Sequence, residues 1–522
     1  MTLRLTLILS AVFLFVAFAV GALFTTRACF MAGAGTGYPS LQQAINRAEP
    51  GCTIILLGGT YHENVVIDKP LTVIPRAQAK PFAILGQHPV GTASAAAFID
   101  PAAPSTLQAA SADRAVIEIR ASHVRIDGLR IEGGRIGIQA TDVRDVQLTN
   151  LTVSRSQEVG IELTGVQESV LRGSTITHAK VGVQLSNSHQ IDVRANVLRR
   201  NGHGIRLENA NANVLRDNEI AHSESAGLRL TASDRNEIHR NALVNNTAGV
   251  VLQDSSHNAL AANRLDRNGT PLRVWGSGTS HFVHRIASDN TINGRPVHYL
   301  VDAEGVTISS ADNAGYLALV RSRNVIVRGV TLPEGSQGVL MISTQGSTIE
   351  NVTIPASEQG LYLQDAADNA LIGNRVERTT DDGITLIRSS GNRLATNVVR
   401  ANGGHGVLID RSDANTLVAN EIRDNQESGV QLSASRGARL SDNRLIGNWV
   451  GVYLDGGGEH RLIDNAISKS QFAVYVQGTR ANRFQSNRLT ENRHASNRPA
   501  LLDAQAEAAG DSDDSETSPS GD

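Results

Sequence analysis

The chain has 522 residues, a formal net charge of −3, only 4% aromatic residues and 48 glycines. A charge so close to neutral provides no overall field that would attract nucleic acid or an anionic membrane, so we expect no nucleic-acid partner. Few aromatic residues together with abundant glycine and asparagine are typical of a turn-rich β protein and argue against a helical one.

The first 34 residues contain a targeting segment. An uncharged apolar run over residues 5–24 follows Arg4 and precedes Arg27. A run of about 20 residues is long for a signal-peptide core and just long enough to cross a bilayer. Residues 1–34 are therefore predicted to be either a cleaved signal peptide or a retained inner-membrane anchor. Both alternatives place the rest of the chain in the periplasm or outside the cell.

The next part of the chain is predicted to start the fold. Within residues 37–75, a short amphipathic helix over residues 41–48 precedes a first strand-rich coil. The two cysteines are Cys29 and Cys52. Cleavage of the targeting segment would remove Cys29, so we expect no disulfide framework, although the compartment would permit one. Residues 76–112, rich in Ala, Pro and Ser, are predicted to form a long excursion loop.

A repeat of 22 or 23 residues then occupies two blocks, residues 113–270 and 331–495. Each repeat begins with Gly–apolar–x–apolar and continues with Asn–x–apolar pairs such as "NVLRDNEI". Period-two alternation predicts short, half-buried strands. We expect each Asn amide to bond to an identical amide one repeat away, and each motif Gly to supply a positive φ at a corner. The motif glycines are Gly137, Gly160, Gly182, Gly204, Gly227, Gly249, Gly338, Gly360, Gly383, Gly406, Gly429 and Gly451.

No single repeat can bury its apolar side chains alone, so the repeats must stack. The predicted fold is an all-β, right-handed parallel β-helix with 22–23 residues per coil and a short N-terminal capping helix. The hand follows from the strong preference of parallel crossover connections. Residues 271–330 are predicted to be an insert that interrupts the 22–23-residue repeat but continues the stack of coils. Residues 496–522, which are acidic and lack apolar anchors, are predicted to form a disordered tail.

Several segments carry a family resemblance. "PGCTIILLGGTYHENVVIDKPLTV" is similar to the opening coil of NosD-like and other pectin-lyase-fold proteins, and "NGRPVHYL" resembles the central insert of NosD-like proteins. The repeats resemble those of carbohydrate-binding proteins and sugar hydrolases. The resemblance covers residues 37–495 and implies a polysaccharide partner. For NosD-like proteins it implies instead an accessory role beside a periplasmic or membrane-anchored partner, either a copper enzyme or a transporter.

The sequence identifies no cofactor, and a copper site is hard to assemble from it. Thiolate and thioether ligands suit Cu(I), but the chain has only two cysteines and three methionines. The better metal candidates are histidines of the interruption, His281, His284 and His298. Side chains at i and i+3 of a strand point to opposite faces, so a shared metal requires a loop or helical turn here.

The second block contains candidate catalytic residues. Asp382 precedes Gly383 and His405 precedes Gly406, so the stack places them in one column on adjacent coils, with Asp381 beside them. "DDG" followed by "GHG" resembles the polygalacturonase arrangement, although the Asn-Thr-Asp and Arg-Ile-Lys elements of that family are absent. These residues predict a hydrolase, lyase or epimerase as the alternative to a binding protein.

An outward aromatic stripe lies in the same block. The outward position after the first apolar motif residue is occupied by Tyr362, Tyr453 and Tyr475, and Trp449 stands beside it. Flat aromatic faces stack on sugar rings, and charged side chains bind sugar hydroxyls. We therefore predict a polysaccharide-binding surface of the stripe together with three charged residues, although tyrosine also favours strands generally. The charged residues are Glu358, Glu427 and Arg388.

Overall fold

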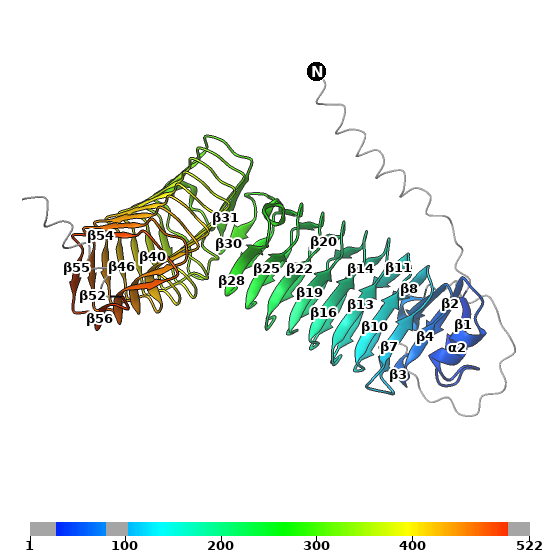
Figure 1. Ribbon diagram of the computed structural model, residues 1–522. Helices are drawn as coiled ribbons and strands as arrows, with labels where there is room; N and C mark the ends of the chain where they lie inside the picture. Colours follow the sequence, from blue (N-terminus) through cyan, green and yellow to red (C-terminus); the bar gives the residue numbers. More distant parts are fainter. Residues whose placement is uncertain (1–27, 80–102, 499–522) are drawn as a thin grey trace, which may run out of the picture.

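The computed structural model describes residues 28–79 and 103–498, which form an all-β parallel solenoid of two arms (Figure 1). The predicted membrane segment at residues 5–24 lies outside the described residues, as do residues 80–102 of the predicted excursion and the tail beyond residue 498. Within the described ranges, no helix is long and apolar enough to span a membrane.

The first arm consists of three parallel sheets. One runs over 11 strands from β1 (Ala28–Ala32) to β29 (Arg285–Ile286). The second, here called motif sheet I, carries the glycine motifs over 9 strands from β4 (Val65–Ile67) to β28 (Thr270–Trp275). The third pairs β3 (Gly59–His62) with β6 (Ser105–Gln108) and ends at β27 (Arg264–Asp266) and β30 (Thr291–Ile292).

The second arm also has three sheets. Its glycine-motif strands form motif sheet II, from β31 (Arg295–Val301) to β56 (His494–Ser496). A sheet of 9 strands runs from β32 (Thr307–Ser309) to β54 (Arg483–Gln485). A sheet of 7 strands runs from β37 (Thr353–Pro355) to β55 (Arg488–Thr490).

The two arms join at a hairpin, here called the elbow. β30 pairs antiparallel with β31, whereas the strands before and after it pair in parallel. The third sheet of the first arm therefore passes directly into motif sheet II. Motif sheet I ends at β28 instead, so the glycine-motif strands of the two arms belong to different sheets. Figure 1 shows the arms meeting at β30 and β31.

Stacking places equivalent residues of successive repeats side by side. Ile161 pairs with Val183, and Val183 with Ile205, on neighbouring parallel strands of motif sheet I. All three side chains are fully buried. Alternate residues of each strand point inward, and equivalent inward residues of successive coils stack into apolar columns that fill the core. Equivalent outward residues stack in the same way and form columns on the surface.

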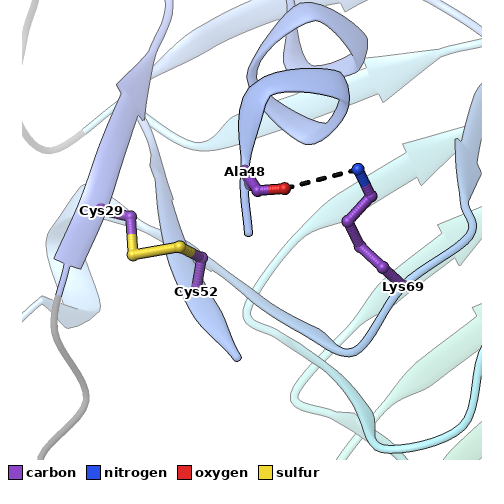
Figure 2. Close-up of a disulfide and its surroundings, with 4 residues drawn as sticks. All are labelled: Cys29, Ala48, Cys52 and Lys69. Carbon is purple, nitrogen blue, oxygen red and sulfur yellow. Dashed lines mark hydrogen bonds between the residues drawn. A yellow bond between two sulfur atoms is a disulfide. The ribbon is translucent and has the colours of Figure 1, made fainter. Parts of the chain in front are cut away.

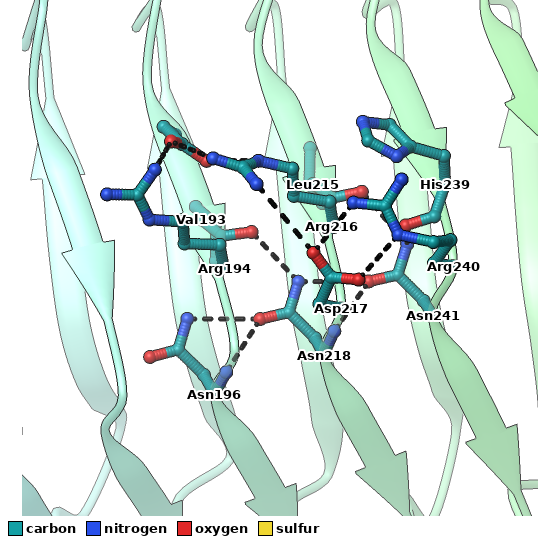
Figure 3. A network of polar contacts seen from close by, with 11 residues as sticks. Val193, Arg194, Asn196, Leu215, Arg216, Asp217, Asn218, His239, Arg240 and Asn241 are labelled. Atoms are coloured by element: carbon teal, nitrogen blue, oxygen red, sulfur yellow. Dashed lines mark hydrogen bonds and ion pairs between the residues drawn. The ribbon is translucent and has the colours of Figure 1, made fainter.

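The predicted asparagine ladder is confirmed. The Nδ2 of Asn196 donates to the Oδ1 of Asn218 at 3.0 Å, and the Nδ2 of Asn218 donates to the Oδ1 of Asn241 at 2.9 Å (Figure 3). The same Oδ1 of Asn218 also accepts from the backbone N–H of Asn196, and its Nδ2 reaches the carbonyl of Val193. These buried amides are thus fully bonded, as buried polar groups must be.

The explanation offered for the motif glycines is wrong for most of them. Gly160, Gly182 and Gly204 do not adopt a positive φ. A Cβ on Gly182 would instead lie 2.6 Å from the carbonyl oxygen of Gly204 one coil away. The motif requires glycine because two backbones approach closely, not because the chain turns there.

The one helix predicted in this region is α2 (Leu41–Arg47), a short helix that begins at the N-cap Ser40. The buried face of α2, including Leu41 and Ile45, packs on β1, β2 (Cys52–Leu56) and β4. β1 lies inside the stretch predicted as a targeting segment, yet it pairs in parallel with β2. Likewise β6, inside the predicted excursion, pairs with β3 and β9 (Arg130–Glu132).

A disulfide that the sequence analysis did not expect joins this end. Cys29 of β1 is bonded to Cys52 of β2 (Figure 2). We expected cleavage of the targeting segment to remove Cys29. In the structure, Cys29 lies in β1, which is a strand of the solenoid. Beside the disulfide, the Lys69 Nζ donates to the carbonyl of Ala48 at 3.4 Å, at the end of α2.

Candidate functional site

A groove of about 750 Å³ lies on the outer face of motif sheet II. It runs across β47 (Ser428–Ser433), β50 (Val450–Asp455) and β53 (Phe472–Gln477). The strand register pairs Gln431 with Tyr453 and Tyr453 with Tyr475, so these outward residues form one column. The groove is lined by His405, Gln426, Glu427, Ser428, Gln431, Trp449, Val450, Tyr453, Phe472 and Tyr475.

The aromatic residues of the groove are held in fixed orientations. The rings of Tyr453 and Tyr475 meet edge to face, with centroids 5.2 Å apart, and Phe472 meets Tyr475 in the same way at 5.3 Å. The hydroxyl of Tyr453 donates to Gln477 at 2.9 Å. Trp449, by contrast, is 62% exposed. A large indole left in water beside ordered tyrosines provides a free apolar face for a ligand.

A polar chain borders the groove across three coils. The Oδ1 of Asp382 accepts from the backbone N–H of His405 at 2.7 Å. The Nδ1 of His405 accepts from the backbone N–H of Ser428 at 3.2 Å, and its Nε2 lies 2.8 Å from Glu427. Because a backbone N–H can only donate, Nδ1 has no proton and Nε2 carries the one that Glu427 accepts. The imidazole is therefore bonded at both nitrogens.

The environment of Asp382 differs from that of Asp381. Burial raises the pKa of Asp382, while the hydrogen bond from the backbone of His405 and the nearby imidazole act in the opposite direction. The hydroxyl of Thr385 also donates to Asp382, at 3.3 Å. Asp381 is exposed. The predicted column of Asp382 and His405 is thus present and continues to Ser428, while Glu427 comes from the neighbouring column, that of Asp381, and contacts the imidazole from the side.

Two predicted ligand residues lie at the elbow instead. Glu358 forms an ion pair of 2.5 Å with Arg273 of β28, and burial raises the pKa of Glu358 while Arg273 opposes the rise. Tyr362 of β38 (Leu361–Gln364) donates to Gln364 at 3.0 Å. Glu358 and Tyr362 line a cavity of about 110 Å³ with Arg273 and Trp275 of the first arm. At the elbow, outward residues of motif sheet II, Leu340 and Tyr362 among them, pack against the core of the first arm.

Arg388, the remaining predicted ligand residue, is engaged elsewhere. Its guanidinium donates twice to the carboxylate of Asp365, at 2.7 and 2.9 Å. Both residues lie outside the groove lining. The structure therefore gathers His405, Glu427, Trp449, Tyr453 and Tyr475 at one site and separates them from Glu358, Tyr362 and Arg388. Sequence analysis missed Gln431 and Phe472, although the first stands in the predicted outward column.

The three histidines proposed as metal ligands do not converge. The ring of His284 is buried, its Nδ1 accepts from the backbone of Asn258 at 3.3 Å, and its Nε2 lies 3.0 Å from the carbonyl oxygen of His281. His284 thus takes the place of a ladder asparagine. His281 lies 3.4 Å from Asp254, and His298 lies 3.4 Å from the carbonyl oxygen of Asp312. Among residues 28–79 and 103–498, no three His, Cys, Asp or Glu side chains form a group that could hold a metal.

With the fold and the groove defined, the chain can be compared with known families. The model of NosD, described as periplasmic copper-binding protein, matches residues 108–192, 130–295 and 283–498. These ranges span both arms and well over half of the chain. The chain belongs to the NosD family. Comparison with curated proteins finds no match.

Solved structures similar to this NosD-family chain include two sugar-active proteins. The periplasmic alginate epimerase AlgG has 10% sequence identity and a TM-score of 0.27, and the alignment covers 68% of this chain and 77% of AlgG. DFA-IIIase from Arthrobacter chlorophenolicus A6, in complex with DFA-III, has 15% identity and a TM-score of 0.35, with 75% and 94% covered. At such identities and scores neither similarity bears on the activity of this chain.

The copper named in the family description does not fit the side chains that the structure describes. Cu(I) favours thiolate and thioether ligands. Both cysteines are consumed by the disulfide, Met341 is fully buried in the core, and Met31 stands 38% exposed on β1. Together with the histidine geometry, this composition offers no copper site within the described ranges.

Proposed function

We propose that this protein is a right-handed β-helix, exported to the periplasm, that binds an extended polysaccharide along the groove of motif sheet II. The observation that carries the proposal is the combination of Trp449, Tyr453 and Tyr475 with the carboxylate of Glu427 in one groove. Aromatic faces stack on sugar rings and carboxylates accept hydrogen bonds from hydroxyls.

The geometry of the stack supports an extended ligand. Outward residues of one column repeat at the spacing of adjacent strands, about 4.8 Å, and the groove crosses three coils and the turns before them. A linear chain lying across the strands would meet the same kind of contact at each coil. Rigid, solenoid-mounted side chains also lose little conformational freedom on binding, which favours affinity.

The test is an affinity panel of neutral and uronic polysaccharides, measured by isothermal titration calorimetry. We expect one class of polymer to bind, and both Trp449→Ala and Tyr453→Ala to weaken that binding about tenfold or more. Tyr38→Ala, at the far end of the solenoid, is the matched control and should bind normally. Absence of binding across the panel, or equal losses in the control, would refute the proposal.

A second candidate is a carbohydrate-active enzyme, and one observation favours it. The Asp382 carboxyl has a raised pKa and lies beside His405 at the edge of the groove. A raised carboxyl pKa is a shift in the direction that a general acid needs. New reducing or unsaturated ends that appear with the wild-type protein and vanish in Asp382→Asn would establish this candidate. Unchanged polymer in a long incubation would exclude it for the polymers tested.

Family membership supports a third candidate, a periplasmic accessory protein that presents a rigid flank to a copper enzyme or a transporter. This role requires no sugar ligand. Neighbouring genes for a copper oxidoreductase and a transporter, and co-purification of their products with this protein, would favour it over polysaccharide binding.

A further inference from the structure

Three arginines occupy one outward column of motif sheet I beside the elbow. Arg206 lies on β19 (His203–Glu208), Arg229 on β22 (Ala226–Thr231) and Arg273 on β28. The register pairs Arg206 directly with Arg229, and a single residue, Val251, separates Arg229 from Arg273 in the column. Adjacent parallel strands are about 4.8 Å apart, so the stems of Arg206 and Arg229 start side by side.

The carboxylates near this column do not balance its charge. Arg206 forms an ion pair with Glu208, and Arg273 forms one with Glu358 of the second arm. Arg229 donates only to the neutral side chain of Gln253, and no ion pair to it is found among the described residues. Glu208 pairs with Arg206 and acts on Arg229 only through its charge, so Arg229 has no ion pair of its own among the described residues.

Polar atoms at the same place lack hydrogen-bond partners. The Nε of Arg206 and the Nδ1 of His203 are both buried, and neither has a partner among the described residues. Burial lowers the pKa of Arg229 and of His203, and the neighbouring arginines lower both further. Leaving such groups unsatisfied costs free energy, so this part of motif sheet I carries positive charge that the protein's own side chains do not fully neutralise.

We propose that Arg206 and Arg229, with His203 beside them, form a binding site for an oxyanion. A guanidinium group presents parallel N–H donors that match the two oxygens of a carboxylate or of a tetrahedral sulfate or phosphate. Gln253 holds Arg229 in position, and Glu208 holds Arg206. The anion comes either from a uronic acid of a sugar chain or from a free inorganic ion. The site goes beyond the proposed function, because none of its residues belongs to the groove of motif sheet II.

The experiment uses the full chain and three probes in isothermal titration calorimetry: sodium sulfate, an oligomer of galacturonic acid, and the matching neutral galactose oligomer. The variants are Arg229→Gln and, as a matched control, Arg240→Gln. Arg240 is an exposed arginine of the same arm that donates twice to Asp217, at 2.7 and 3.0 Å (Figure 3). It follows β23 (Glu237–His239), which belongs to a different sheet from β22. Trp449→Ala reports on the groove separately.

We expect sulfate or the galacturonate oligomer to bind, and Arg229→Gln to weaken that binding about tenfold or more while Arg240→Gln leaves it unchanged. Binding of both anions identifies an inorganic or general oxyanion site, and binding of the oligomer alone identifies the uronic acid as the source. The proposal is overturned if neither anion binds, or if both arginine variants bind equally. Loss of neutral oligomer binding in Trp449→Ala concerns the groove alone, so the two proposals stand or fall independently.

Discussion

The Nε2 of His405 lies 2.8 Å from the carboxylate of Glu427, one coil further along the second arm. The other ring nitrogen accepts from the backbone N–H of Ser428, so the imidazole is held at both ends. Glu427 is thereby fixed at the rim of the groove, while its side chain remains 58% exposed. This arrangement makes Glu427 a positioned acceptor and leaves His405 without a free lone pair for use as a base.

Glu427→Gln should weaken polysaccharide binding about tenfold without changing the free energy of unfolding, because hydrogen bonds to a charged acceptor contribute about 1.5–3 kcal/mol. The measurement is a calorimetric titration beside a urea unfolding curve. Glu334→Gln, which removes an exposed carboxylate outside the groove, is the control. An unchanged affinity in Glu427→Gln would remove this carboxylate from the binding site.

His405→Ala should act on stability as well as on binding. It removes the acceptor of the buried Ser428 N–H, so we expect the free energy of unfolding to fall by about 1–2 kcal/mol. The same urea titration checks this. An unfolding free energy equal to that of the wild type would show that the hydrogen bond from the Ser428 N–H to His405 does not stabilise the protein.

The asparagine ladder predicts a large effect of a single amide. Asn218→Ala removes two donated and two accepted hydrogen bonds inside the stack, so the free energy of unfolding should fall by about 2–4 kcal/mol. Asn46→Ala, an exposed amide of α2, should cost less than about 1 kcal/mol. Similar decreases in the unfolding free energy of both variants would show that the asparagine ladder does not contribute specially to stability.

The motif glycines predict a steric effect. In Gly182→Ala the new methyl group would meet the Gly204 carbonyl oxygen, 2.6 Å from the ideal Cβ position, so the free energy of unfolding should fall by about 1–3 kcal/mol. At Gly37 an added Cβ meets nothing within 4 Å, so Gly37→Ala provides the matched control. Thermal unfolding of the two variants separates the explanations. If they melt alike, close backbone approach is not the reason for the motif.

Two buried histidines predict how stability depends on pH. Burial lowers the pKa of His284 and of His460 from 6.5 to about 4. Between pH 4 and pH 6.5 the unfolded chain binds more protons than the folded one. Each buried histidine therefore contributes stability that is complete above about pH 6.5. This contribution, about 2–3 kcal/mol, is lost as the pH falls toward 4. His460 accepts from the backbone of Ala438 as a ladder asparagine would. His460→Asn should therefore flatten the curve of unfolding free energy against pH over this window. A curve as steep as that of the wild type would count against this account of His460.

Much of the second arm follows from the repeat. Counting from the motif glycines puts Tyr453 and Tyr475 in one outward column and Asp382 and His405 in another, because strand alternation and coil length alone decide which residues are neighbours. The partners of a column residue also follow, so Glu427 beside His405 is within reach of the same reasoning. The side-chain orientations that close the groove, such as Phe472 against Tyr475, are not.

The contacts that the repeat does not predict are found where the repeat is interrupted, at the elbow and before the first coil. Tyr362 shares the column of Tyr453 but lies at the elbow, because β31 reverses against β30 and Tyr362 there packs against the core of the first arm. That reversal depends on the backbone geometry of residues 291–296, which carries no repeat signal. The Cys29–Cys52 disulfide was missed for a related reason, since β1 precedes the first recognisable repeat.

The most direct test of the groove uses Trp449 as its own reporter. The chain has two tryptophans, so Trp275→Phe leaves Trp449 as the single tryptophan, which can be excited selectively. Titration of this variant with the polysaccharide that binds in the calorimetric panel should shift the Trp449 emission to shorter wavelength and protect it from iodide, with a midpoint equal to the calorimetric Kd. Emission and quenching that stay unchanged at saturating polysaccharide would contradict the groove as the binding site.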